Sequence, residues 1–75
     1  MLQVDLNGTD KEIERVIVKH CSKYGPVASI KIHRSPSAFA LVEMSKREQT
    51  FELIAEFGGS TFGACALIHL KQVAK

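Results

Sequence analysis

The 75-residue sequence predicts one small α+β domain, spanning residues 1–75, with helices packed on one face of a β-sheet. Two observations predict this class. Apolar residues alternate with polar ones in some segments, at the period of a strand, and recur every third or fourth residue in others, at the period of a helix. The composition, 45% hydrophobic and 24% charged, is that of an ordinary globular domain, and a chain of this length has room for one core.

The first quarter of the chain predicts a strand followed by a helix. Residues 2–6 alternate apolar and polar side chains, which is typical of a strand with one buried face. Thr9 and Glu12 form a capping-box pattern that begins a helix of about four turns, and Gly25-Pro26 ends it. The apolar stripe of this helix is expected to contain Ile13, Val16, Ile17, His20, Cys21 and Tyr24.

The middle of the chain predicts a hairpin. Residues 27–33 are rich in β-branched side chains, residues 38–44 alternate again, and residues 34–37 between them carry turn chemistry. These two strands are expected to pair antiparallel, so that their polar faces point the same way.

The last third predicts a helix and a strand. Ser45 and Glu48 repeat the capping-box pattern and begin a helix through Phe57, which Gly58-Gly59 closes. Its apolar face is expected to contain Phe51, Ile54 and Ala55. Residues 64–71 alternate as a strand does. The order strand, helix, strand, strand, helix, strand predicts a ferredoxin-like βαββαβ sandwich, a four-stranded antiparallel sheet with both helices on one face.

Two junctions and one strand carry a resemblance to a known family. Residues 24–27 read Tyr-Gly-Pro-Val, and residues 57–59 read Phe-Gly-Gly, with Phe-Gly again at 62–63. These runs resemble the junctions after the first and second helices of RNA recognition motifs, and the likeness covers nearly the whole chain. In the segment that corresponds to the family's octamer, three residues agree with its pattern: Phe39, Ala40 and Val42.

The resemblance implies that the open sheet face binds single-stranded RNA, with rings stacking on bases and cations meeting phosphates. Phe39 keeps one stacking ring, whereas Leu41 and Gln3 stand where the family has the other two. A stacked base is worth about 1–3 kcal/mol, so the sequence predicts weak binding, with a Kd on the order of ten micromolar to millimolar. Arg34, in the turn, is expected to reach a phosphate. The predicted RNA-binding residues are Phe39, Leu41, Gln3, Lys31, His33, Arg34, Leu67, His69 and Lys71.

A protein-interaction module on the same fold is the alternative, because two stacking rings are missing. Against one version of it, residues 60–62 (Ser-Thr-Phe) lack the Arg-x-Phe of peptide-binding relatives. A third class, a small enzyme or metal carrier, is disfavoured because residues 7–10 have neither a CxxC pair nor an arginine. Cys21 and Cys65 have no metal-binding spacing, and the glycines lack a phosphate-loop frame, so no catalytic residue, metal site or cofactor is expected.

Charge and cysteine content narrow the setting. A net charge of +2 and a pI near 8.7 permit RNA binding without requiring it. Two cysteines without a disulfide framework predict a reduced, intracellular protein, in the nucleus or the cytoplasm. No apolar run approaches the roughly 18 residues of a membrane span, so we expect no membrane contact. The domain is also expected to be monomeric.

Overall fold

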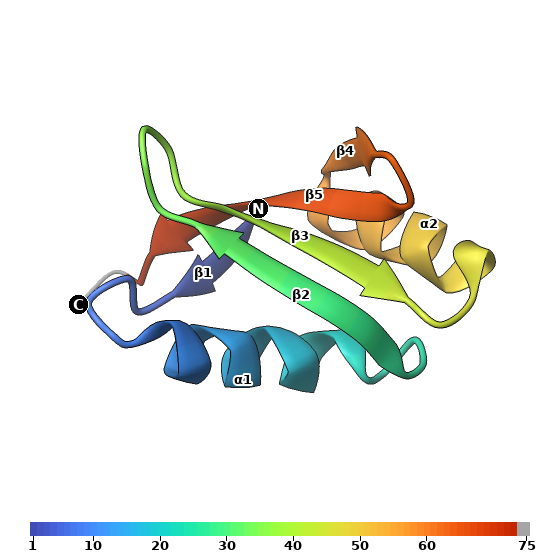
Figure 1. The fold of residues 1–75 in the computed structure, drawn as a ribbon, viewed down its shortest axis with the longest axis horizontal. Coiled ribbons are helices and arrows are strands. Elements are labelled where there is room, and N and C mark those ends of the chain that lie inside the picture. Colours follow the sequence, from blue (N-terminus) through green and yellow to red (C-terminus); the bar gives the residue numbers. More distant parts are fainter. Residues whose placement is uncertain (74–75) are drawn as a thin grey trace.

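The structure, a computed structural model, describes residues 1–73 and contains two helices and five strands (Figure 1). The helices are α1 (Asp10–Cys21) and α2 (Arg47–Phe57). The strands are β1 (Leu2–Val4), β2 (Val27–His33), β3 (Phe39–Met44), β4 (Ser60–Phe62) and β5 (Cys65–Gln72). The α+β class and the order of the predicted elements are confirmed, and β4 is an additional strand.

The sheet is mixed, which corrects the expected four-stranded antiparallel arrangement. Its strand order is β1-β5-β3-β2, and β4 pairs with β5 outside this path. β5 runs antiparallel to β3 and β4 but parallel to β1, where Leu2 lies opposite Leu70. The first residues of β5 pair with β4 and its last residues pair with β1. The long final strand therefore lies inside the sheet, and the short first strand lies at an edge.

A tight hairpin produces the additional strand. Phe62 lies opposite Cys65, so only Gly63 and Ala64 form the turn between β4 and β5. Gly63 has a φ of +61°, whereas Ala64 does not have a positive φ, which fits a type II′ turn. A glycine at the first turn position between two short β-prone runs is a recognised hairpin signal. The sequence prediction treated this segment only as a junction and so missed the strand.

The helix α1 begins as predicted. The Glu12 backbone N–H donates to Thr9 Oγ1 at 3.2 Å, and the Thr9 N–H donates to the Glu12 carboxylate at 3.0 Å, which completes the capping box. The helix ends earlier than predicted, at Cys21 with Ser22 as its C-cap, so the expected end at Gly25-Pro26 was wrong. Its buried side chains are Ile13, Ile17 and Cys21. The buried stripe is narrower than predicted, since Val16 is 38% exposed.

The capping box predicts a specific pH dependence of stability. Hydrogen bonds from the Thr9 N–H and hydroxyl hold the pKa of Glu12 below its usual 4.5. A lowered pKa in the folded state contributes stability above the unfolded pKa, and this contribution is lost as the pH falls through the folded pKa. The Glu12→Gln variant is therefore expected to melt below the parent at pH 7, with a gap that narrows below about pH 4.5. Thermal melts across this range test it, with Glu14→Gln as the control, and a gap independent of pH would contradict it.

The helix α2 begins differently from the prediction. Its N-cap is Lys46, which makes no side-chain capping hydrogen bond, so the capping box expected at Ser45 and Glu48 is wrong. Its buried side chains are Thr50 and Leu53, while Phe51 is 47% exposed and Ala55 is exposed. The expected face was thus wrong for Phe51 and Ala55. Gly58 ends the helix as predicted, in the left-handed conformation with a φ of 70°.

Both helices pack on one face of the sheet, as predicted, and cover the inward side chains of β1, β2, β3 and β5 (Figure 1). The buried cluster contains Leu2, Val4, Ile13, Ile17, Cys21, Ala40, Val42, Met44, Leu53, Ala66, Ile68 and Leu70. Neither helix in residues 1–73 has the length and apolar character needed to cross a bilayer. The opposite face of the sheet has no helix over it and carries the candidate site.

Candidate functional site

The open face of the sheet, opposite the helices, is built by the alternation of side chains along each strand. Ala40 and Val42 in β3, and Ala66 and Ile68 in β5, have no exposed surface, so the residues between them point the other way. Strand pairing then aligns these outward residues in rows across the sheet. The open face consists of Gln3, Ser29, Lys31, His33, Phe39, Leu41, Glu43, Ser60, Phe62, Cys65, Leu67, His69 and Lys71.

One row of the open face contains three rings. Pairing places Phe39 of β3 between His33 of β2 and His69 of β5. The His33 and Phe39 rings are stacked, with centroids 4.7 Å apart and planes 11° apart. His33 therefore covers one face of the half-buried Phe39 ring, while His69 is exposed. A flat ligand that joins this row has to use the remaining face of Phe39.

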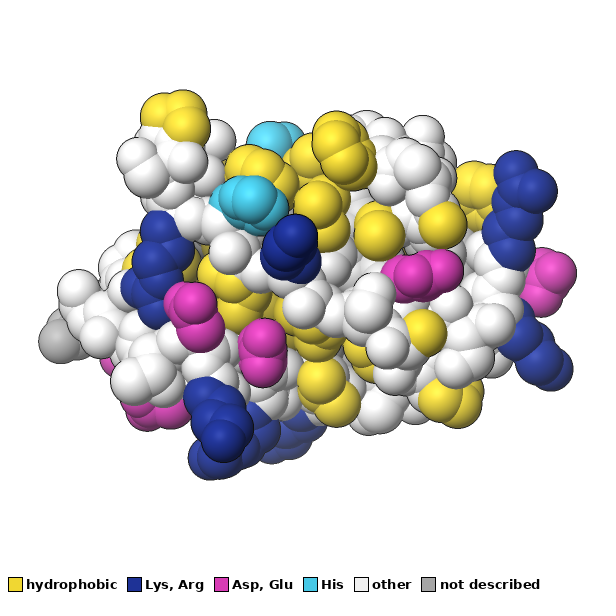
Figure 2. Space-filling view, viewed as in Figure 1, with side chains coloured by type: hydrophobic (Ala, Val, Ile, Leu, Met, Phe, Trp, Pro, Cys, Tyr) yellow, Lys and Arg dark blue, Asp and Glu magenta, His cyan; other side chains and the backbone are white. Residues whose placement is uncertain are grey.

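The next row is apolar at its centre. Leu41 and Leu67 lie opposite each other and are half-buried, and the exposed Lys31 flanks Leu41 on β2. On the other side of the ring row, Lys71 lies opposite Gln3 of β1. Hydrophobic and histidine side chains gather over the strands in Figure 2, with Lys and Arg side chains around them. The open face thus offers apolar contacts in the middle and cations beside them.

Arg34 stands apart from this surface. Its guanidinium contacts the Asp10 carboxylate at 2.8 Å and donates to the carbonyl oxygens of Leu6 and Gly8, each at 2.7 Å. These bonds hold the turn between β2 and β3 against the loop between β1 and α1. A phosphate contact by Arg34 would have to replace bonds that it already makes within the domain.

The structure places the other predicted RNA-binding residues on one surface. Rows across β2, β3 and β5 bring together Lys31, His33, Phe39, Leu41, Leu67 and His69. Gln3 and Lys71 join them at the β1 side of the sheet. Of the predicted set, only Arg34 lies in the hairpin turn and is held there by partners of its own.

One aromatic residue of the open face was missed as a site residue. Phe62 of β4 lies opposite Cys65, whose neighbour Ala66 is buried, so both Phe62 and Cys65 point outward. The Phe62 side chain is 61% exposed. The signal that could have revealed it is the glycine of the following turn, which makes residues 60–62 a strand rather than a loop.

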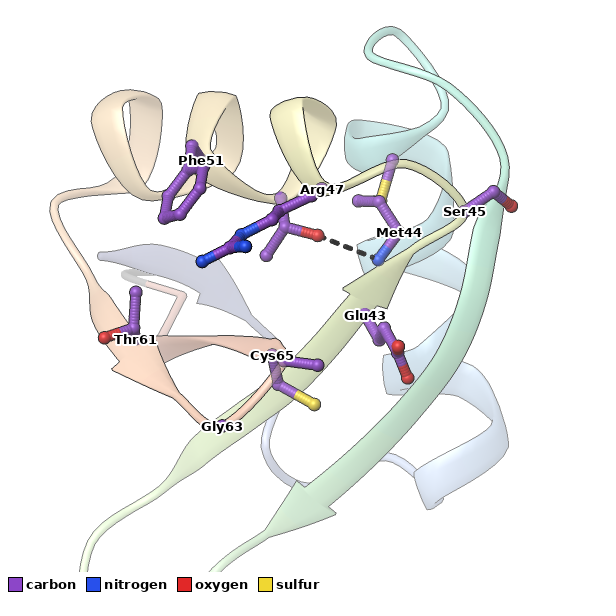
Figure 3. Close-up of a pocket in the computed structure, with 10 residues that line it drawn as sticks. Glu43, Met44, Ser45, Arg47, Phe51, Thr61, Gly63 and Cys65 are labelled. Carbon is purple, nitrogen blue, oxygen red and sulfur yellow. Dashed lines mark hydrogen bonds between the residues drawn. The ribbon is translucent and has the colours of Figure 1, made fainter.

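A groove opens between α2 and β4, beyond the last β3–β5 pair, Val42 and Ala66 (Figure 3). Its volume is about 640 Å³, and Figure 3 shows Arg47 and Phe51 reaching into it from α2. The Arg47 guanidinium lies 5.6 Å from the centroid of the Phe51 ring. The charged side chains of the lining are one guanidinium and one carboxylate, that of Glu43, so charge selects neither an anion nor a cation.

The two thiols differ in environment. Cys21 is in the core, and burial raises the pKa of its thiol to about 11, which keeps it protonated and unreactive near neutral pH. Cys65 is half-buried on the open face. Within residues 1–73, no group of three or more His, Cys, Asp or Glu side chains could hold a metal ion.

No family model, curated protein or solved structure matches this chain. Its function is therefore inferred from the chemistry of the open face.

Proposed function

We propose that the open face binds single-stranded RNA weakly. The row His33–Phe39–His69 is the observation that carries this proposal. Bases stack on aromatic rings whatever their sequence, because every base has a π-face. Since His33 already covers one face of Phe39, a base stacks on the other face, on the side of β5 where His69 can contact it.

Cations beside the rings supply the phosphate contacts. Lys31 and Lys71 are exposed on either side of the ring row and carry positive charge at neutral pH. Phosphate contacts position a nucleic acid and make its binding depend on salt. With two such contacts, the logarithm of the association constant is expected to fall with the logarithm of the salt concentration at a slope of about −1.4. This slope is shallow for a nucleic-acid-binding protein. One available ring face and two lysines are consistent with a Kd on the order of ten micromolar to millimolar.

We also propose that this α+β domain has a ferredoxin-like fold. The strand and helix order and the placement of both helices on one face support a ferredoxin-like, RNA recognition motif-like domain. It departs from that arrangement in its strand order, which places β1 at the edge with β5 between β1 and β3, in the parallel pairing of β1 with β5, and in the inserted strand β4. Both thiols are free, which suits a reducing compartment, the nucleus or the cytoplasm.

A protein contact through the same face is the second candidate. The half-buried Leu41 and Leu67 favour it, because apolar side chains on an open sheet often mark a protein-binding surface. The ring row and the adjacent lysines favour RNA.

The Phe39→Ala variant tests the stacking contact. We expect it to weaken binding of short pyrimidine-rich and purine-rich RNAs by about 5- to 30-fold, the lower part of the range for one stacked base because one ring face is already covered. NMR titration measures this loss and should show shifts at the amides of β3 and β5 in the parent.

Phe51→Ala is the matched control, because Phe51 is a partly exposed ring on α2, which lies on the helix-covered side of the sheet. It should leave RNA affinity unchanged. An absence of amide shifts at millimolar RNA would refute RNA binding, whereas a Phe39→Ala protein that binds like the parent would refute the stacking role alone. Shifts at the amides of β3 and β5 on adding cell extract, with none on adding RNA, would instead favour the protein-contact candidate.

A further inference from the structure

We infer that Phe62 is a second stacking platform, so that the bound strand runs across the open face from Phe39 to Phe62. This inference rests on the proposed function. It adds a binding residue that lies on β4, outside the strands on which the predicted binding residues lie.

The hairpin holds the Phe62 ring on the open face. Its register with Cys65 fixes the direction of the side chain, and the short Gly63-Ala64 turn limits how far β4 can shift. Phe62 remains 61% exposed, so the core does not account for its position. A large apolar ring that stays in solvent on a paired strand is available to a ligand.

The distance between the two rings fits an RNA strand that passes over several residues of the open face. Phe62 on β4 is separated from Phe39 on β3 by the width of two strand spacings, with β5 between them, and by two rows along the strands. The spacing between strands and the rise per residue together give a distance of roughly 16 Å. Leu41 and Leu67 lie between them and form an apolar floor. The two rings are therefore too far apart to stack on neighbouring bases of the RNA. They would stack on bases that are separated by several nucleotides.

Charge defines what the Phe62 end of this path can contact. Glu43 of β3 would lie opposite Cys65 if the β3–β5 register continued one pair further, in the same row as Phe62. Its carboxylate repels phosphate, whereas Lys31 and Lys71 lie nearer to Phe39. Phe62 is thus expected to hold a base, with the phosphate contacts concentrated at the Phe39 end.

The experiment compares a dinucleotide with a hexanucleotide of the same base, because only the longer RNA can reach both rings. We expect Phe62→Ala to weaken hexanucleotide binding by about 5- to 30-fold and to leave dinucleotide binding unchanged. Phe39→Ala should weaken both RNAs. Phe62→Tyr, which keeps a ring, should retain affinity, whereas Phe62→Leu should lose it. Phe51→Ala is the control, and backbone amide spectra verify that each variant keeps its fold.

Each result decides between the two levels of the proposal. A Phe62→Ala protein that binds the hexanucleotide like the parent overturns the second platform and leaves the proposed function standing. Equal losses for the dinucleotide and the hexanucleotide, or full affinity in Phe62→Leu, overturn it as well. A parent protein that binds neither RNA overturns the proposed function and this inference together.

Discussion

The Gly59→Ala variant is expected to lose about 3 kcal/mol or more of folding free energy. A Cβ at position 59 would lie 2.1 Å from the Leu67 carbonyl oxygen and 3.1 Å from its carbonyl carbon. Both are backbone atoms of β5, so no side-chain rotation can relieve the contact. The alanine has to push β4 away from β5 and weaken the pairing of Ser60 with Leu67.

Urea and thermal unfolding measure this loss, which corresponds to a fall of about 12 to 24 °C in Tm for a domain of this size. Gly58→Ala is the matched control, because Gly58 has a φ of 70° but nothing within 4 Å of its Cβ position. It should cost only the strain of a left-handed alanine, about 1–2 kcal/mol. A Gly59→Ala protein at least as stable as Gly58→Ala would show that β4 does not approach β5 so closely.

The same variant connects stability with the proposed binding site. Gly59 allows β4 to lie against β5, and β4 carries Phe62. Under conditions in which Gly59→Ala is still folded, a displaced β4 should therefore reduce hexanucleotide affinity more than dinucleotide affinity.

The open face was predictable because alternation is a local property of each strand. Residues 27–33 formed a strand at the predicted bounds, and β3 and β5 kept the predicted alternation. Once one residue of such a strand is buried, the direction of every neighbour follows. Phe39 and His69 could accordingly be placed on one face without knowledge of which strands pair.

The antiparallel pairing of β2 with β3 was predicted and is confirmed, whereas the pairing of β1 with β5 was not predictable from local pattern. β1 and β5 lie at opposite ends of the chain and pair in parallel, a contact that no local repeat in residues 2–6 or 64–71 encodes. The sequence prediction assumed that the element order implied an antiparallel sheet. The hairpin from β4 to β5 gives β5 the direction in which its last residues run alongside β1.

The face of α2 was mispredicted because hydropathy is only one requirement of a buried position. Phe51 is more apolar than Thr50, yet Thr50 is buried and Phe51 is not. The Met44 backbone N–H at the end of β3 donates to Thr50 Oγ1 at 3.2 Å, in a buried position. An unsatisfied buried N–H would cost about 1–3 kcal/mol, so the hydroxyl is retained inside.

The Arg34→Ala variant is expected to lose about 2–3 kcal/mol of folding free energy while keeping its affinity for RNA within about twofold. The guanidinium joins the β2–β3 turn to the loop between β1 and α1 through Leu6, Gly8 and Asp10. Hydrogen bonds that involve a charged group are stronger than neutral ones, but the side chain is 41% exposed, so solvent reduces their sum. This result would make Arg34 a structural residue rather than the predicted phosphate contact.

Two further variants separate charge from geometry. Arg34→Lys keeps the positive charge but lacks the planar fork that serves three acceptors at once, so it should lose most of the same stability. Asp10→Asn removes the ion pair and one negative charge of the first turn of α1 but leaves the bonds to the Leu6 and Gly8 carbonyls, so its loss should be smaller. If Arg34→Lys were instead as stable as the parent, and Arg34→Ala lost RNA affinity that lysine restored, the guanidinium would act on phosphate and the sequence prediction for Arg34 would stand.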